Sequence, residues 1–439
     1  MNKQKLVRAF VIATVVLLGL LLGTSIAASV PKANCGPRDR TESGLQGETT
    51  QEERFSGDSE LGYNCNLELV GKQPQGAFEG AFSQDGPAYF GDCAYYGTDR
   101  VTSLQQHLGV RVIDASDPRH PRVSTYLNDT AAARAPHETV AVHAERKLLV
   151  VGENNGPNFA VYDLSADCRH PVLKSSIDLP GSQGHMGAFA PDGLTYWLTN
   201  AGANFGEFLY SVDLTDPSNP VMLPPWQFGE IGRPHEVQVN PAGFLLGVPE
   251  GTRLYAGQLD SPPNVAGGLV IMDVSDYQFR LPNPEIRIIS TLFWDGSGAE
   301  PMVPVKINGH PYIIASDESG AARGVDFWAG ACAREAPPFG FPRIIDVGDE
   351  TNPKIIAELM LEVSDPANCS ALLAETPPDF PGTAPGTNLP AESGTTNYSE
   401  ERCVADNPDD AKMLACSFQH GGLHGRELHI WSCSVALGQ

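Results

Sequence analysis

The stretch GVRVIDASDPRHPRVSTYL, residues 109–127, contains the pattern that decides the fold. A run of alternating apolar residues ends in Asp114, a proline-containing turn follows, and a second strand-like run follows the turn. Alternating β-branched and aromatic residues suit half-buried strands. Aspartate caps turns and proline fixes φ. The stretch therefore predicts two strands joined by a tight turn, with the aspartate as a structural turn residue.

The pattern recurs four more times, at a spacing of about 50 residues. The copies are FAVYDLSADCRHPVLKSSIDL (159–179), FLYSVDLTDPSNPVMLPPWQF (208–228), GLVIMDVSDYQFRLPNPEIRIISTL (268–292) and FPRIIDVGDETNPKIIAELML (341–361). Two further strands are predicted before three of these copies, at His137–His143 and Leu148–Gly152, His185–Ala190 and Thr195–Thr199, and His235–Asn240 and Phe244–Val248. Four antiparallel strands per unit are typical of a propeller blade.

The sequence therefore predicts an all-β chain folded as a β-propeller of about six to seven four-stranded blades. The last blade departs from the pattern. Met413–Phe418 predicts its second strand, but no aspartate–proline turn follows Leu423. Either the ring closes in an unusual way or this blade is incomplete.

The N-terminal segment predicts export. Residues 1–30 have basic residues at Lys3, Lys5 and Arg8, then an apolar run and a Ser25-Ile26-Ala27 cleavage site, which together indicate a signal peptide. The alternative is an uncleaved anchor, because the apolar run is nearly long enough to span a membrane. We expect a secreted, periplasmic or cell-surface protein, with a membrane contact only through this segment.

The rest of the chain is divided by composition. Residues 31–60 are polar and predict a flexible linker, and residues 61–439 predict the propeller domain. Within this domain, residues 364–397 are rich in Pro, Gly and Thr without periodicity, which indicates a long surface insertion. The formal net charge is −24, so binding to nucleic acid is excluded as a function class.

The nine cysteines form no C-x-x-C pair, which argues against a cysteine zinc site. In an oxidising compartment we expect disulfides. Proximity within the predicted blades favours Cys65–Cys93 and Cys369–Cys403. The odd count leaves at least one cysteine outside any intramolecular pair.

The units resemble the LVIVD repeat of secreted bacterial and archaeal propeller proteins. The matching stretches are VRVIDASDP, VYDLSAD, YSVDLTDP, VIMDVSD and RIIDVGD. The resemblance covers roughly residues 60–430 and implies the fold rather than a chemistry, since this family is largely uncharacterised. A more distant likeness is to the selenium-binding protein and methanethiol oxidase propellers, which carry histidines at the channel mouth and a bound metal.

Histidines and carboxylates are predicted to meet at one mouth of the channel. His137, His185 and His235 each stand six residues before a predicted hairpin, at the start of an inner strand. The following strands are predicted to end in Glu153, Asn200, Glu250 and Asp317. Imidazole and carboxylate ligands suit a divalent transition metal, so we predict a metal site of His137, His185, His235, Glu153 and Glu250. The ring lacks a histidine near Pro301 and Arg402, and His420 could fill one gap.

Glu138 and Glu236 follow two of these histidines and are predicted to point the other way, where they could orient the ligands. Two alternatives stay open: the histidines could simply pack where blades meet, or they could serve metal-free acid–base chemistry. The first functional hypothesis is a binding or interaction scaffold for an unknown protein or small molecule. The alternative is a metal-dependent enzyme, an oxidoreductase by analogy, and a structural cell-surface module is a third reading.

Overall fold

The structure is a computed structural model of the chain. It describes residues 30, 32–48, 50–66, 68, 70–71, 88–97, 107–136, 140–182, 184–200, 208–232, 234–258, 266–295, 298–317, 327–375, 399–405, 413–420 and 431–436. No helix among these residues is long and apolar enough to cross a membrane. The predicted signal segment lies outside them.

Strands that are consecutive in the chain form antiparallel sheets. The first sheet contains β1 (Ala88–Phe90), β2 (Cys93–Tyr96), β3 (Val110–Asp114) and β4 (Arg122–Leu127), and the second contains β5 (Val140–His143), β6 (Leu148–Gly152), β7 (Asn158–Asp163) and β8 (Val172–Asp178). The third contains β9 (Gly184–Phe189), β10 (Thr195–Asn200), β11 (Phe208–Asp213), β12 (Val221–Met222) and β13 (Trp226–Gln227), and the fourth contains β14 (Pro234–Val239), β15 (Arg253–Gln258), β16 (Ala266–Asp273) and β17 (Arg287–Asp295). The fifth contains β18 (Ala299–Ile307), β19 (His310–Asp317), β20 (Arg343–Asp346) and β21 (Lys354–Glu358), and a three-stranded sheet contains β22 (Ser399–Ala405), β23 (Met413–His420) and β24 (Trp431–Ala436).

Short helices lie between the strands. They are α2 (Gln51–Ser56), η1 (Asp58–Leu61), α3 (Ala131–Arg134), η2 (Gly229–Ile231), α4 (Ser275–Gln278), α5 (Phe327–Ala333), η4 (Glu362–Ser364), η5 (Pro366–Asn368) and α6 (Cys369–Glu375). The chain is therefore mostly β, and the prediction of repeated four-stranded antiparallel sheets is confirmed.

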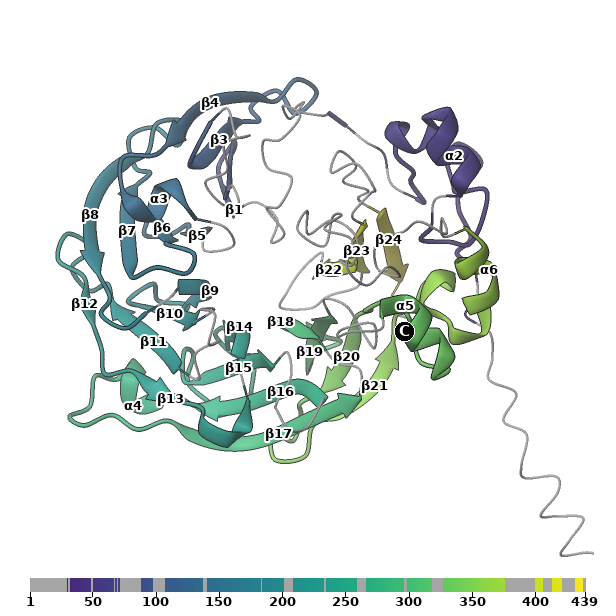
Figure 1. The fold of residues 1–439 in the computed structure, drawn as a ribbon. Coiled ribbons are helices and arrows are strands. Elements are labelled where there is room, and N and C mark those ends of the chain that lie inside the picture. The colour runs from purple at the N-terminus through teal and green to yellow at the C-terminus, as the bar shows by residue number, and fades with distance from the viewer. Residues whose placement is uncertain are drawn as a thin grey trace, which may run out of the picture.

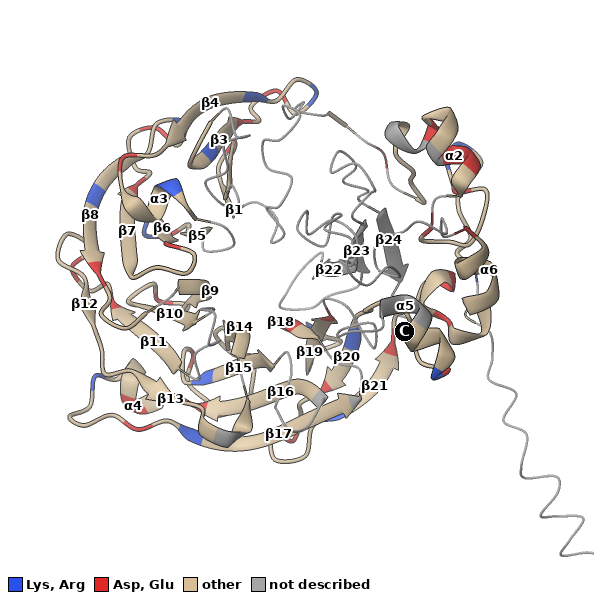
Figure 2. Ribbon diagram, viewed as in Figure 1, with Lys and Arg blue, Asp and Glu red and all other residues tan. Residues whose placement is uncertain are grey.

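The first five sheets are arranged radially around a common centre (Figure 1). Their first strands lie innermost, and β1, β5, β9, β14 and β18 each contact the next one in the series. Their last strands lie at the rim, as Figure 1 shows for β4, β8, β12, β17 and β21. This is the propeller-like arrangement that the repeat predicts. Acidic residues are spread over the turns around it and over α2 (Figure 2).

The hydrophobic cores lie between successive sheets. Tyr95 and Leu149 belong to the cluster between the first two sheets, and Trp197 and Val237 belong to the cluster between the third and fourth. Comparable clusters join the second sheet to the third and the fourth to the fifth. The second, third and fourth sheets are thus packed against a neighbour on both faces, which explains the many apolar residues of their inner strands.

The repeated aspartates are turn residues, as predicted. Each ends the third strand of its sheet and accepts a hydrogen bond from the backbone N–H two residues later, over 2.8 to 3.0 Å. The pairs are Asp114 with Ser116, Asp163 with Ser165, Asp213 with Thr215, Asp273 with Ser275 and Asp346 with Gly348. The carboxylate therefore stabilises the turn by replacing a strand partner for this N–H group.

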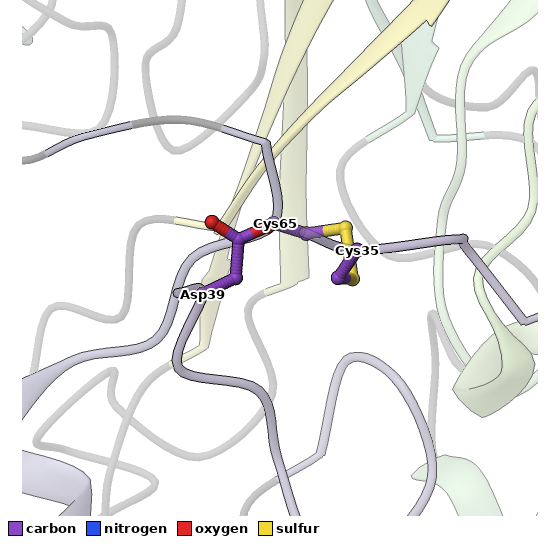
Figure 3. Close-up of side chains that lie close together, drawn as sticks. All are labelled: Cys35, Asp39 and Cys65. Atoms are coloured by element: carbon purple, nitrogen blue, oxygen red, sulfur yellow. A yellow bond between two sulfur atoms is a disulfide. The ribbon is translucent and has the colours of Figure 1, made fainter. Parts of the chain in front are cut away.

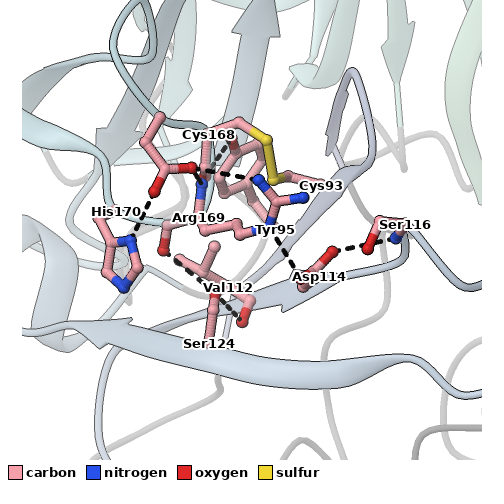
Figure 4. The surroundings of a disulfide bond; sticks show 10 residues. Cys93, Tyr95, Val112, Asp114, Ser116, Ser124, Cys168, Arg169 and His170 are labelled. Atoms are coloured by element: carbon pink, nitrogen blue, oxygen red, sulfur yellow. Dashed lines mark hydrogen bonds and ion pairs between the residues drawn. A yellow bond between two sulfur atoms is a disulfide. The ribbon is translucent and has the colours of Figure 1, made fainter.

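Two of these aspartates also join neighbouring sheets. Arg169 of the second sheet donates to Asp114 of the first over 2.8 Å (Figure 4), and Arg280 beside α4 donates to Asp213 of the third over 2.8 Å. The hydrogen bond from Arg169 lowers the pKa of Asp114. One carboxylate thus closes a turn and fixes the next sheet.

The second strand of the fourth sheet differs from the prediction. The expected strand Phe244–Val248 is a loop, and the strand is β15, which begins nine residues after Phe244, at Arg253. Gly243, Gly247 and Gly251 have positive φ angles, which turn the chain within this loop. Phe244 is buried against Tyr255, with ring centroids 5.9 Å apart. The apolar residue at this position is therefore explained by a loop that packs on the sheet, and not by a strand.

Both predicted disulfides are wrong. The described disulfides are Cys35–Cys65, Cys93–Cys168 and Cys332–Cys369. Cys93–Cys168 joins the first and second sheets, because Cys93 at the start of β2 meets the turn between β7 and β8 that carries Cys168 (Figure 4). Proximity in sequence misled the prediction because radial packing brings together positions one blade apart.

Residues 32–66, which overlap the predicted linker, have fixed contacts instead. Gln46 N–H donates to Glu362 over 2.9 Å, and Gln51 N–H donates to Glu375 at the end of α6 over 2.7 Å. A buried apolar cluster lies beside these bonds and contains Tyr63, Phe339, Leu361, Val363 and Leu372. The segment that precedes the first sheet therefore packs on the segment that follows the fifth (Figure 1). Composition could not show these contacts, because they join residues more than 300 positions apart.

A prediction follows from the ion pair of Asp213. Partial burial raises the pKa of its carboxyl, but hydrogen bonds from Arg280 and Thr215 outweigh burial and lower the pKa to about 2. The ionised form therefore stabilises the fold above the unfolded pKa near 3.8, and this contribution is lost as pH falls through about 2.

We expect Asp213→Asn to lower the free energy of unfolding by about 1 kcal/mol at neutral pH, allowing for solvent screening. The difference from the unmodified protein should shrink as pH falls below about 4. Urea denaturation at a series of pH values measures it. A difference that does not change with pH would contradict the account.

Candidate functional site

The inner ends of the third, fourth and fifth sheets share one irregularity. There the first residue of the first strand pairs with the last residue of the second strand. The pairs are Gly184 with Asn200, Pro234 with Gln258, and Ala299 with Asp317. Directly after each pair the register shifts by one residue, with the extra residue on the first strand. The residues that follow the first members are His185, His235 and Glu300. Such bulges re-aim side chains and often lie next to active sites.

Close contacts fix the bulges of the fourth and fifth sheets against the preceding sheet. The hydroxyl oxygen of Thr199 lies 2.6 Å from the carbonyl oxygen of His235. One sheet further on, a Cβ placed on Gly257 would stand 2.0 Å from the carbonyl oxygen of Glu300. Thr199 and Gly257 occupy the same position of their strands, one residue before the strand end. The bulged backbone therefore packs directly on its neighbour, and at position 257 only glycine leaves room for it.

The three bulged side chains contact one another. The Nε2 atoms of His185 and His235 lie 2.8 Å apart, and their rings are nearly perpendicular, at 87°. Nδ1 of His235 lies 3.5 Å from Oε1 of Glu300. All three residues are buried, with 8%, 6% and 3% of their surfaces exposed. Glu300, His235 and His185 thus form a continuous buried series across three sheets.

The geometry restricts where protons can be. Two Nε2 atoms at hydrogen-bond distance share one proton, because two donors or two acceptors would repel. The carboxylate of Glu300 lies beside Nδ1 of His235 and favours a proton there. His235 then presents the lone pair of Nε2 to His185. This arrangement can pass a proton along the series, or it can offer nitrogen ligands to a metal.

Two of the predicted metal ligands, His185 and His235, are therefore brought together. Glu153 lies at the end of β6 as expected, but Asn158 donates its backbone and side-chain N–H groups to it. Glu250 is exposed in the loop before β15, so its placement at a strand end was wrong. Gln258 occupies that strand end instead, because the true second strand begins at Arg253.

Glu236 is buried and accepts a hydrogen bond from Gln238 over 3.0 Å. Its side chain is thus paired along its own strand. His137 and Glu138 lie outside the described residues.

Glu300 was not predicted from the sequence. The corresponding position was expected at Pro301, one residue too far along the chain. In the fifth sheet the turn aspartate Asp346 pairs with Tyr312, and Tyr312 pairs with Val305. The residue five positions before Val305 is Glu300, and the same steps in the third and fourth sheets lead to His185 and His235. That count requires the strand register, and the single bulge residue makes the sequence spacing ambiguous.

A second group of potential ligands lies in the N-terminal segment, where Cys35, Asp39 and Cys65 bring one ligand atom each within 4.8 Å of one another (Figure 3). The two cysteines form a disulfide. Asp39 accepts hydrogen bonds from the N–H groups of Gly36 and Asn66, each over 2.6 Å. The disulfide leaves no thiolate to bind a metal, and the carboxylate of Asp39 is held by backbone hydrogen bonds. We therefore interpret this group as structural.

No protein-family model and no curated protein sequence matches the chain. Among solved structures, it is similar to the periplasmic gluconolactonase of Pseudomonas aeruginosa, with 11% identity, a TM-score of 0.45 and coverage of 76% of this chain and 80% of that one. It is also similar to hydrazine synthase of Kuenenia stuttgartiensis, with 15% identity, a TM-score of 0.45 and coverage of 81% and 80%. A functionally unknown protein of Desulfotomaculum acetoxidans has 10% identity, a TM-score of 0.45 and coverage of 85% and 95%. These similarities are to propeller-like proteins with different activities, and they assign no chemistry to the site.

The packing at Gly257 gives a prediction. Gly257→Ala places a methyl group against the backbone of Glu300, so β18 must move away from β15. We expect the free energy of unfolding to fall by about 1–3 kcal/mol, as in other overpacked cores. Denaturant unfolding followed by circular dichroism measures the change.

Gly36→Ala is the matched control, because the nearest atom to the added group is the side-chain Oδ2 of Asp39, 3.3 Å away. It should alter stability by less than about 0.5 kcal/mol. Equal effects of the two substitutions would contradict the packing described here.

Proposed function

We propose that this chain is an exported β-propeller of the LVIVD-repeat type, with six to seven blades, that binds a divalent transition-metal ion through His185 and His235. The observation that carries the proposal is the approach of their two Nε2 atoms to 2.8 Å in a buried setting. Three disulfides and the signal-like N-terminal segment support export to a periplasmic or extracellular compartment.

The residues present fit such an ion. Metal–nitrogen bonds of about 2.0–2.1 Å in a tetrahedral site require the two nitrogens to stand about 3.3 Å apart. The rings therefore need to separate by only about half an ångström. The proton between them must leave when both nitrogens bind, so affinity should rise with pH.

Glu300 would fix the orientation of His235. Ligating histidines commonly donate their other ring N–H to a carboxylate, which holds the tautomer and raises the basicity of the ligand nitrogen. The 3.5 Å approach of Glu300 to Nδ1 places it for this role. Glu300 lies on the opposite side of the His235 ring from His185, so it supports the metal ligand rather than joining it.

A second candidate function is metal-free acid–base chemistry. The buried series from Glu300 to His185 favours it, because a carboxylate next to an imidazole is a common arrangement of a general base. Both candidates belong to the alternative hypothesis of a His/carboxylate site at the channel mouth, rather than to the first functional hypothesis of a binding or interaction scaffold.

Metal content tests the proposal. The full-length chain should be loaded with Zn²⁺ near neutral pH, desalted and measured by elemental analysis. We expect about one ion per chain, and a loss of at least tenfold in affinity for His185→Ala and for His235→Ala, because each removes one of two ligand nitrogens.

His310→Ala is the matched control. His310 is a partly exposed histidine that contacts Asp346 over 2.7 Å in the fifth sheet, and its loss should leave the zinc content unchanged. Zinc at background level in the unmodified protein would overturn the metal proposal and leave the acid–base candidate.

A further inference from the structure

Gln258, at the inner end of β15, carries a buried amide that has no hydrogen-bond partner among the described residues. Its exposed fraction is 0%, and neither Oε1 nor Nε2 has a partner in the part of the chain that the structure describes. A buried polar group left unpaired costs about 1–3 kcal/mol. A residue of similar volume without polar atoms would avoid this cost, so the amide has no evident structural role.

The equivalent residues of other sheets differ from Gln258 in this respect. Asp317 ends β19 and accepts hydrogen bonds from Gly298 N–H over 3.0 Å and from Arg343 over 3.1 Å. Glu153, which follows β6, is held by Asn158. These strand ends use their polar groups to fix the surrounding loops, whereas Gln258 keeps both of its amide groups available.

Gln258 also lies on the face of the fourth sheet that carries His235. Leu254 and Ala256 of β15 pack in the same cluster as Val237 of β14, against the third sheet. Side chains alternate along β15, whose pairing with β16 is regular, so Gln258 continues the series of Leu254 and Ala256 that faces the third sheet. His235 faces the third sheet as well, because its Nε2 atom contacts that of His185. The bulge places His235 and Pro234 together opposite Gln258.

We propose that Gln258 binds the oxygen ligand, a water molecule or a carboxylate, that completes the coordination of the metal held by His185 and His235. This inference rests on the proposed function. Two histidines leave coordination positions open to such a ligand. The amide N–H of Gln258 can donate to an oxygen bound there, which would satisfy the buried group.

Gln258→Met tests the proposal, because it removes the amide and keeps the volume. The probe is Co²⁺, whose visible absorption reports its coordination, followed by acetate as the oxygen ligand. We expect Gln258→Met to bind Co²⁺ within about threefold of the unmodified protein and to bind acetate about tenfold more weakly, the loss expected from one hydrogen bond. The metal-free variant should unfold at the same temperature or a higher one.

Asp317→Asn is the matched control at the same position of the next sheet. It weakens an occupied pair with Arg343, so it should lower the unfolding temperature and leave the affinity for acetate within threefold. Unchanged acetate binding by Gln258→Met, or a lower unfolding temperature of its metal-free form, would overturn the role of Gln258. Failure of the unmodified protein to bind Co²⁺ would overturn the proposed function itself, and with it the ligand assigned to Gln258.

Discussion

One extra residue at the start of β9, β14 and β18 is the constraint on which the site depends. In an unbulged strand the side chains at these positions would alternate strictly between the two faces of the sheet. The extra residue turns the side chains of His185, His235 and Glu300 toward the neighbouring sheets. His235 therefore contacts His185, and Glu300 contacts His235. The contact between Gly257 and the carbonyl of Glu300 sets how close two sheets can come. The site is thus a product of how the sheets pack.

The conspicuous parts of the sequence form the scaffold of this arrangement. Turn aspartates close the third strand of each sheet, and Arg169 and Arg280 connect these turns to neighbouring sheets. The apolar inner strands fill the space between sheets and leave the histidines buried at their ends. Rigid support of this kind keeps the two imidazoles together, and it also limits how far they can separate to admit an ion.

Much of the fold could be predicted from the repeat, because turn aspartates and strand alternation are local signals. The strands of the second and third sheets follow from them, as do the last two strands of the first and fifth sheets. The fourth sheet was predicted less well, because the apolar loop around Phe244 resembles a strand. This error placed Glu250 at the strand end that Gln258 occupies in the structure. His185 and His235 were found by their equal spacing from the hairpins. Glu300 and the disulfides were missed, since they depend on register and on contacts between blades.

The tautomer of His235 tests the central claim most directly, because only the series from Glu300 to His185 dictates it. Long-range nitrogen–proton NMR correlations of the imidazoles should be recorded for the metal-free protein at mildly alkaline pH. The account predicts a proton on Nδ1 of His235, an unprotonated Nε2 facing His185, and a clear change of these signals in Glu300→Gln. A proton on Nε2 of His235 whose signals do not respond to Glu300→Gln would contradict it.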